Sequence, residues 1–526
     1  MSRTGSPDEA TAPSPRSSRT SRFAPRFAVG LVAGLVTAMS VPPMGLWIAG
    51  IVGLGIHAAH LRRRGLRGRL VAGLGFGFGL YTVGIFWTHE FSWPGFIALV
   101  AIETFFAVVS AALAIAGGRG AAPFLFGAAM ALGEWGRTVA PFEGFPMGGI
   151  TLGQAAGPLA PAARTGGAVF GVTLAVCLAA AAVAEIVGAV ATVKGRADHG
   201  RVAGAAGAAV CCVALVGLGG GAGRASGSLR VALVQGGGPR GTRALTTDPR
   251  VVFTRHLEAS QKLVGGTGAT PDIVLWPENT VKTDDLLAAT DEGDALRSLA
   301  ERLGGPTLMV GVVEDVRDDP THFSNYQTAI GPDGRILGRY DKVHRVPFGE
   351  YAPLRSFVAR FADLSLLPKD AIPGTEPGIL TTATGTPAGV LISYELFFGD
   401  RATASVRAGA QILLGPTNAA SYRTSQVPDQ ELAAARLRAW ETGRDIALVA
   451  PTGFSAFVLA DGTVHAKTAL SQRTVIQREL TLHTGHTPYV RTGDRPWLIL
   501  CALVAAGGLC NDVVTRVRAR TPARRR

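Results

Sequence analysis

Three polar side chains stand where apolar runs of the sequence end. Glu278 ends "DIVLWPE", Lys342 ends "RILGRYDK" and Ser393 ends "AGVLIS". If the chain brings them together, they supply a carboxylate, an ammonium and a nucleophile, which is the set of groups that covalent catalysis uses. Taken singly, each has an ordinary explanation: Glu278 as a helix cap, Lys342 as a surface residue of a hairpin, and Ser393 as a turn residue. The residues alone leave both interpretations open.

The elements that would position these groups lie in an alternating region that follows a Gly-rich linker. Apolar runs typical of buried strands, such as "LRVALVQGG" and "QILLGPTN", alternate with helical patterns such as "DPRVVFTRHLEASQKLV" and "DQELAAARLRAWETGR". This alternation predicts an α/β sandwich with helices on its outer faces. In such folds reactive groups gather at the carboxyl ends of strands, which is where Glu278 and Ser393 are expected.

Several longer blocks resemble a known superfamily. "LWPENT" at 275–280, "GRYDKVHRVPFGEY" at 338–351 and "ISYELFFGD" at 392–400 are similar to the nitrilase (carbon-nitrogen hydrolase) superfamily, whose members use a Glu-Lys-Cys triad in this chain order. "PTNAASY" at 416–422 and "AAARLRAWETGR" at 433–444 resemble its membrane branch, the apolipoprotein N-acyltransferases. The resemblance extends over nearly the whole chain.

The resemblance implies roles for individual residues. It makes Glu278 the general base and Lys342 the positive group that stabilises the tetrahedral intermediate. Ser393 stands at the nucleophile position, where the family has a cysteine. The supporting residues carried over from the family pattern are Glu350, Tyr394 and Glu395. Neither a metal nor another cofactor is implied.

The implied reaction moves a fatty acyl chain from a phospholipid to the N-terminal diacylglyceryl-cysteine of an apolipoprotein through an acyl-enzyme. A serine hydroxyl is a much weaker acid than a thiol, whose ordinary pKa is about 8.5, and its ester is less activated toward an amine than a thioester. Two alternatives therefore stay open. The protein is a catalytically impaired or inactive paralogue because of Ser393, or it is a membrane-bound hydrolase of the amidase type.

Composition predicts a membrane region. The chain has 526 residues, 47% hydrophobic content and a mean hydropathy of +0.27. Eight stretches approach the roughly 20 apolar residues that a membrane crossing needs, at about 27–43, 44–60, 70–88, 94–116, 121–138, 166–193, 202–219 and 496–515. Because Pro42 and Pro43 divide the first two, these could instead form one re-entrant hairpin.

Arginine and lysine cluster in alternate loops and in both tails, as the positive-inside rule requires. Seven crossings from a cytoplasmic N-terminus place residues 220–495 outside the cytoplasm of a bacterial cell. The net charge of +13 comes from the tails and short loops, while residues 229–482 carry nearly equal numbers of acidic and basic residues. We therefore expect membrane association and no nucleic-acid partner. Four carboxylates in or beside spans are expected at helix ends or lipid headgroups: Glu90, Glu103, Glu134 and Glu143.

The predicted fold is thus a multi-pass α-helical membrane domain plus an extracytoplasmic α/β nitrilase-like sandwich with α-β-β-α layers. The expected segments are a disordered basic tail at 1–22, a transmembrane bundle of about seven helices at 23–219, a linker at 220–228, the catalytic domain at 229–485, a transmembrane helix at 496–515 and a basic cytoplasmic tail at 516–526. All five cysteines lie in expected spans, so the catalytic domain offers no thiol nucleophile.

Overall fold

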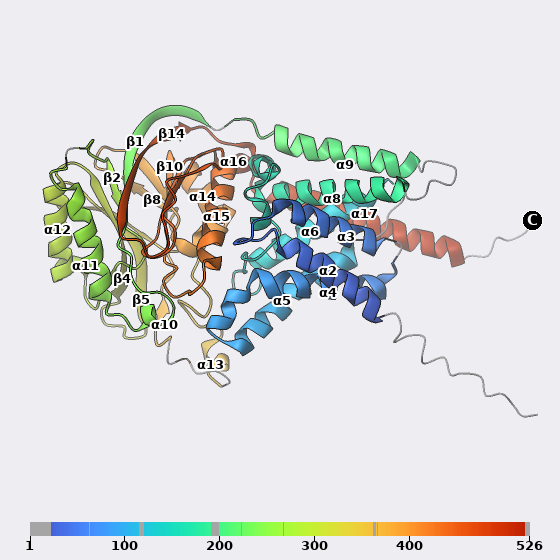
Figure 1. The fold of residues 1–526 in the computed structure, drawn as a ribbon, viewed down its shortest axis with the longest axis horizontal. Coiled ribbons are helices and arrows are strands. Elements are labelled where there is room, and N and C mark those ends of the chain that lie inside the picture. The colour runs from blue at the N-terminus through green and yellow to red at the C-terminus, as the bar shows by residue number, and fades with distance from the viewer. Residues whose placement is uncertain are drawn as a thin grey trace, which may run out of the picture.

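The computed structural model describes the chain except residues 1–22, 63, 115–119, 191–198, 222, 267, 361–363, 365–366 and 521–526. The basic tail expected at 1–22 and the last part of the tail expected at 516–526 lie outside the described residues. A helical region, made of residues 23–219 and the C-terminal helix, adjoins an α/β region made of the residues between them (Figure 1). This arrangement confirms the predicted combination of a helical region with an α/β sandwich.

The helical region is built from apolar helices. They are α2 (Phe23–Ala38), α3 (Trp47–Leu61), α4 (Leu66–Gly84), α5 (Trp93–Leu113), α6 (Ala122–Val139), α7 (Ala163–Gly166), α8 (Thr173–Val190), α9 (His199–Gly217) and α17 (Arg495–Arg520). By length and composition, four described segments can cross a membrane: Trp93–Leu113, Ala160–Ala189, His199–Gly217 and Arg495–Thr515. Helices α2 and α3 are shorter apolar helices. The count of eight crossings remains a prediction.

Glycines in α4 let neighbouring helices approach closely. A Cβ atom at Gly75 or Gly79 would overlap the backbone of α2, and one at Gly73 or Gly77 would stand against the side chains of α5. Small residues that allow such close contact are typical of helix packing in membranes. The glycine run of α4 therefore lies at the centre of the helical region.

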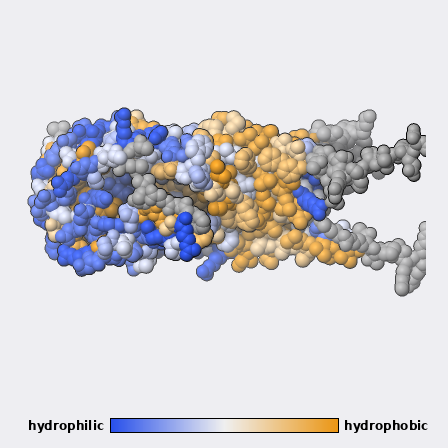
Figure 2. Space-filling view, turned by 90° about the horizontal axis from the view of Figure 1, so that it is seen from below, coloured by the Kyte–Doolittle hydropathy of each residue, from blue (hydrophilic) through white to orange (hydrophobic). Residues whose placement is uncertain are grey.

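The outer surface of the helical region is hydrophobic, whereas the α/β region is covered mainly by hydrophilic residues (Figure 2). Large apolar side chains exposed on the helices include Val29, Val32, Leu35, Ile48, Val52, Phe78, Ile97, Phe105, Val183, Ile186, Val187, Val210, Val213, Ile499 and Leu503. Soluble proteins rarely expose a continuous apolar surface of this extent, so contact with lipid explains it better than contact with water.

Two sheets form the centre of the α/β region. The first has the order β14-β1-β2-β4-β5-β6, with β3 beside β4 and β7 beside β5. Its strands are β1 (Arg224–Gln235), β2 (Ile273–Leu275), β3 (Val281–Thr283), β4 (Thr307–Asp315), β5 (His322–Ile330), β6 (Ile336–Asp341), β7 (Asp370–Ala371) and β14 (Thr474–Thr484). The second has the order β13-β12-β11-β10-β9-β8. Its strands are β8 (Ile379–Thr381), β9 (Pro387–Val390), β10 (Ile412–Pro416), β11 (Ile446–Val449), β12 (Ala456–Val458) and β13 (Val464–His465).

Alternation along the strands divides the core into layers. In β1, Val231 and Leu233 join the apolar cluster between the sheets, while Ala232 and Val234 join the cluster beneath the outer helices. These outer helices are α11 (Pro249–Ser260) and α12 (Asp291–Leu303), and α14 (Gly399–Arg407) and α15 (Gln426–Thr442) cover the second sheet. The short helices α10 (Thr242–Leu245), α13 (Arg355–Val358) and α16 (Pro488–Thr492) lie in connections. The layers are therefore α-β-β-α, as predicted.

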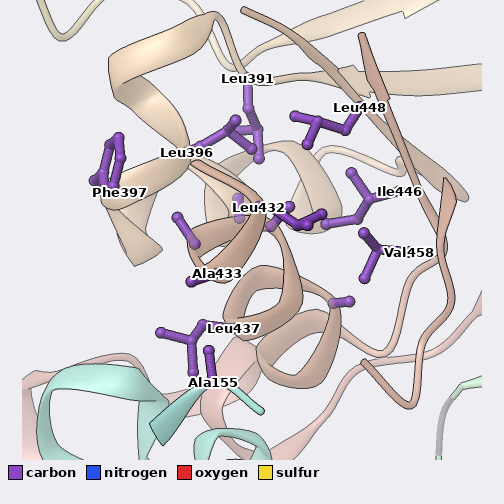
Figure 3. Close-up of a cluster of buried hydrophobic side chains, with 14 of the residues drawn as sticks. Ala155, Leu391, Leu396, Phe397, Leu432, Ala433, Leu437, Ile446, Leu448 and Val458 are labelled. Carbon is purple, nitrogen blue, oxygen red and sulfur yellow. The ribbon is translucent and has the colours of Figure 1, made fainter. Parts of the chain in front are cut away.

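Helix α15 lies between the second sheet and the helical region. Its Leu432 packs toward the strands, whereas Leu437 lies beside Ala155 of the helical region (Figure 3). The same cluster contains Trp87, from the 3-10 helix Phe86–Glu90, and Met147, from a loop of the helical region. Because one apolar core continues across this boundary, the α/β region is packed against the helical region through α15 rather than tethered by a linker alone.

Candidate active site

The three residues singled out from the sequence lie at strand ends, and all three are buried. Glu278 follows β2 and is 4% exposed, Lys342 directly follows β6 and is 2% exposed, and Ser393 follows β9 and is 9% exposed. Burial excludes the interpretation of Lys342 as a surface residue of a hairpin. The first two come from one sheet and Ser393 from the other, so the site lies where the two sheets meet.

Lys342 is the centre of a compact polar group. Its Nζ lies 2.8 Å from Glu278 Oε1 and 2.9 Å from Glu350 Oε1. The Asn325 side-chain amide donates to the same two oxygens, at 2.9 Å and 2.7 Å. The structure therefore brings the predicted Glu278, Lys342 and Glu350 together, with Asn325 fixing the two carboxylates.

The backbone around Glu278 is held close to the sheet. A Cβ atom at Gly311 of β4 would stand 2.7 Å from Glu278 Cα, so only glycine allows this approach. The Thr280 amide donates to the Gly311 carbonyl at 3.1 Å, and Asn279 has a positive φ of 55°. This tight turn aims the Glu278 carboxylate at Lys342.

Burial and charge set the protonation of this group. Burial raises the pKa of Glu278, and the ammonium of Lys342 opposes that rise. Burial alone would lower the pKa of Lys342, but the carboxylates of Glu278 and Glu350 more than offset it and hold that pKa above its ordinary value. Lys342 therefore stays an ammonium, and Glu278 can accept a proton more readily than an exposed carboxylate.

Ser393 begins a short 3-10 helix, Ser393–Phe397, in an unusual conformation. Its φ is +49°, in the left-handed region that residues other than glycine rarely adopt. Strain of this kind is found preferentially at functional sites. Within the described part of the chain, no hydrogen bond joins the Ser393 hydroxyl to Glu278 or Lys342. Among the described residues, the turn therefore presents the hydroxyl without a hydrogen bond to either of these two groups.

Glu395 holds this turn in place. Its buried carboxylate accepts hydrogen bonds from the Tyr340 hydroxyl, the Val343 amide and the Ile392 amide, each at 2.8 Å. Val343 is next to Lys342 and Ile392 is next to Ser393. Glu395 thus links the segments that carry the predicted ammonium and the predicted nucleophile, which come from different sheets.

Tyr394 points away from the α/β region toward the helical region. Its hydroxyl donates to the Gly144 carbonyl at 3.0 Å, and its ring contacts Phe145 and Phe398. The residue that follows Ser393 is therefore anchored in a loop of the helical region.

Sequence reasoning missed three residues of this site: Asn325, Tyr422 and Glu431. Glu431 is 3% exposed on α15, and its charge interacts with Glu278 and Lys342. Tyr422 interacts with the same two charges. Tyr422 ends the block "PTNAASY" and Glu431 lies in the predicted helix "DQELAAARLRAWETGR". That helix carries several other polar residues, so no pattern singled Glu431 out. In the described ranges no group of three or more His, Cys, Asp or Glu residues could hold a metal ion.

Glu431 makes stability depend on pH. Burial raises its pKa to about 8, and the neighbouring Glu278 adds to this rise. Since the unfolded chain loses this proton at ordinary glutamate pH values, the stability gained from the bound proton is present at pH 5 and is lost as pH rises through 8. Glu431→Gln, which resembles the protonated form, is expected to match the parent at pH 5 and to melt roughly 3–6 °C higher at pH 8.5.

Thermal unfolding in detergent at the two pH values measures this difference. Glu479→Gln is the matched control, because the Glu479 carboxylate is 57% exposed and its loss should have the same small effect at both pH values. If Glu431→Gln and the parent differed in melting temperature by the same amount at pH 5 and pH 8.5, the raised pKa of Glu431 would be contradicted.

Comparison with known proteins shows which families the chain resembles. The family model described as carbon-nitrogen hydrolase matches residues 230–487, and that described as the apolipoprotein N-acyltransferase N-terminal domain matches residues 33–182. The chain is 30% identical over 472 residues to the apolipoprotein N-acyltransferase of Agrobacterium fabrum, covering 84% of this chain and 87% of that protein. With the apolipoprotein N-acyltransferase of Mycolicibacterium smegmatis it shares 32% identity over 286 residues, which span 47% of that protein. A solved mutant of the Nesterenkonia AN1 amidase from the nitrilase superfamily covers 51% of this chain and 95% of its own, with 20% identity and a TM-score of 0.35.

Proposed function

Because this chain belongs to the apolipoprotein N-acyltransferase family, we propose that it moves a fatty acyl chain from a membrane phospholipid to the N-terminal amine of a diacylated lipoprotein. The observation that carries the proposal is the contact of buried Glu278 and Lys342 with partly buried Glu350, in an α/β region packed on apolar helices, with Glu395 linking the segment after Lys342 to the Ser393 turn. In this proposal Glu278 is the base, Lys342 the cation and Ser393 the nucleophile.

In the first step the Ser393 hydroxyl attacks the ester carbonyl of the phospholipid. Glu278 takes the hydroxyl proton as the new C–O bond forms, and Lys342 offsets the negative charge that develops on the carbonyl oxygen. The bond to the glycerol oxygen then breaks, and Glu278 returns the proton to that oxygen. The products are a lysophospholipid and an acyl ester on Ser393.

In the second step the amine of the lipoprotein attacks this ester. The incoming ammonium, with an ordinary pKa of about 8, first loses one proton to water. As the C–N bond forms, Glu278 takes a second proton from nitrogen and gives it to the Ser393 oxygen when the C–O bond breaks. The enzyme is restored, and one proton is released for each amide formed.

Both substrates are held in a membrane, which accounts for the architecture. We expect the apolar helices to span the bilayer and the α/β region to lie on the extracytoplasmic side, as the distribution of arginines predicts. Exposed apolar side chains near the site, Phe348, Leu354 and Phe357, would then contact lipid at the interface. This placement lets acyl chains reach Ser393 sideways from the membrane.

Incubation of the purified chain with a labelled phospholipid and a diacylated lipopeptide tests the proposal. Labelled triacylated product, detected by mass spectrometry, is expected from the parent or from Ser393→Cys. The matched control is the same lipopeptide with an acetylated N-terminus, which should receive no acyl chain. Release of labelled fatty acid without any triacylated product would instead identify a hydrolase, and neither product from any form would identify an inactive paralogue.

A further inference from the structure

A buried cluster of charges lies inside the helical region and includes none of the groups that perform the proposed chemistry. Arg137 of α6 is 1% exposed, and its Nε lies 2.5 Å from Glu103 Oε2 of α5. Glu134 Oε2 is 3.6 Å from Arg137 Nη1. The Tyr81 hydroxyl of α4 donates to Glu134 at 3.3 Å, and its ring lies 4.9 Å from the Arg137 guanidinium carbon. Glu103 and Glu134 are therefore buried partners of Arg137, so the expected position at helix ends or headgroups is wrong for both.

This cluster fixes the loop that follows α6. Arg137 donates from Nη2 to the Met147 carbonyl, and its own carbonyl accepts from the Phe145 amide at 2.7 Å. A Cβ atom at Gly149 would collide with the Arg137 guanidinium, so the loop backbone lies directly against it. The Arg137 side chain at Met147 and Gly149, and its backbone at Phe145, thus hold residues 140–151, the positioning loop, from the inner side.

The outer side of the positioning loop contacts the α/β region. The Gly144 carbonyl accepts from the Tyr394 hydroxyl at 3.0 Å, and the Gly148 amide donates to Gln430 of α15 at 3.0 Å. Gln430 also donates to the Gly84 carbonyl at the end of α4, at 2.8 Å. The loop therefore connects the charge cluster to the residue next to Ser393 and to the helix that carries Glu431.

We propose that Arg137 is a positioning residue, which acts on acyl transfer through the positioning loop: this loop binds the Tyr394 hydroxyl and thereby anchors the residue next to Ser393. The inference rests on the proposed function for its reaction. A charged group inside a membrane is expensive, and pairing α5 with α6 would need only the contact between Arg137 and Glu103. The additional bond to the loop backbone is what a positioning role requires, because the Ser393 turn has a strained φ and needs support from its surroundings.

A double-mutant cycle tests the link. Arg137→Gln and Tyr394→Phe are each expected to lower kcat about tenfold while the KM for phospholipid changes less than about twofold. The double variant is expected to be no slower than the slower single variant, because both changes remove the same support. Arg137→Lys should recover little, since an ammonium cannot reach Glu103 and the Met147 carbonyl together. Losses that multiply in the double variant would overturn the proposal.

Arg69→Gln is the matched control. Arg69 is a buried arginine near the start of α4 that donates to the Ala114 carbonyl, whereas the positioning loop lies against Gly84 at the other end of that helix. Arg69→Gln should lower thermal stability without lowering kcat. A loss of kcat in Arg69→Gln equal to that in Arg137→Gln would show that Arg137 matters only through general stability. The alkylation rate of the thiol introduced by Ser393→Cys reports on the conformation of the same turn. This measurement needs no lipopeptide acceptor. If no form transfers acyl chains, the proposed function fails, while an alkylation rate unchanged by Arg137→Gln would overturn the positioning role.

Discussion

Replacing Ser393 with cysteine is expected to raise the rate of acyl transfer to a diacylated lipopeptide at least about 100-fold, which corresponds to roughly 2.7 kcal/mol of barrier. A thiol loses its proton to Glu278 far more easily than a hydroxyl does, and a thioester reacts more readily with an amine than an oxygen ester. Because oxygen and sulfur occupy the same position on the turn, the groups around Lys342 and Glu395 need not move.

Initial rates with labelled phospholipid measure this increase in acyl transfer. Two further variants show whether the increase depends on position 393. Ser393→Ala, which lacks the hydroxyl, should form neither the acyl-enzyme nor the triacylated product. Ser405→Cys places a thiol at another buried serine of the same region, where it should leave the rate unchanged. Residues 229–485 contain no cysteine of their own, so each variant adds a single thiol there. A Ser393→Cys form no faster than the parent would show that position 393 does not supply the nucleophile.

The layers of the fold, and the residues that the structure brings together in the candidate site, could be predicted from the sequence because local signals pointed the same way. Glu278, Lys342 and Ser393 each end an apolar run, and the blocks around them also resemble one superfamily. The order of the strands in each sheet was harder to predict from the sequence. In β1 both Val231 and Ala232 are fully buried, so the alternation that would assign a residue to one face is hidden by apolar residues on both.

Contacts between distant segments account for what could not be predicted. Asn325 lies within a strand, and its partner Glu278 is 47 residues away, so no spacing along the chain indicates the pair. Arg137 has the same difficulty, because its side chain contacts Glu103 across two helices and its effect on Tyr394 passes through a loop. Such residues carry no local pattern, and only the folded chain shows what they touch.

Replacing Lys342 with methionine is expected to remove acyl transfer almost completely, by about 10³-fold or more, and to destabilise the chain. The methionine side chain fills nearly the same volume but leaves buried Glu278 next to partly buried Glu350 without a cation. Breaking a buried pair in this way costs about 3–5 kcal/mol. The rate is best measured in a chain that combines Lys342→Met with Ser393→Cys, so that a loss of about 10³-fold can be followed. The stability is measured by thermal unfolding in detergent.

The pH dependence of this loss identifies its cause. With the ammonium gone, protonation of Glu278, whose pKa burial raises, relieves the repulsion between the two carboxylates. The melting temperature of Lys342→Met should therefore approach that of the parent as pH falls from 8 to 5. Lys369→Met is the matched control: its ion pair with Asp315 is partly exposed, with side chains 31% and 20% accessible, and its loss should cost less than about 1 kcal/mol. If Lys342→Met were as mild as Lys369→Met at pH 8, the two carboxylates would not depend on Lys342 for their charge. Glu278 would then have to work as a base without the cation beside it, and the oxyanion would need another source of positive charge.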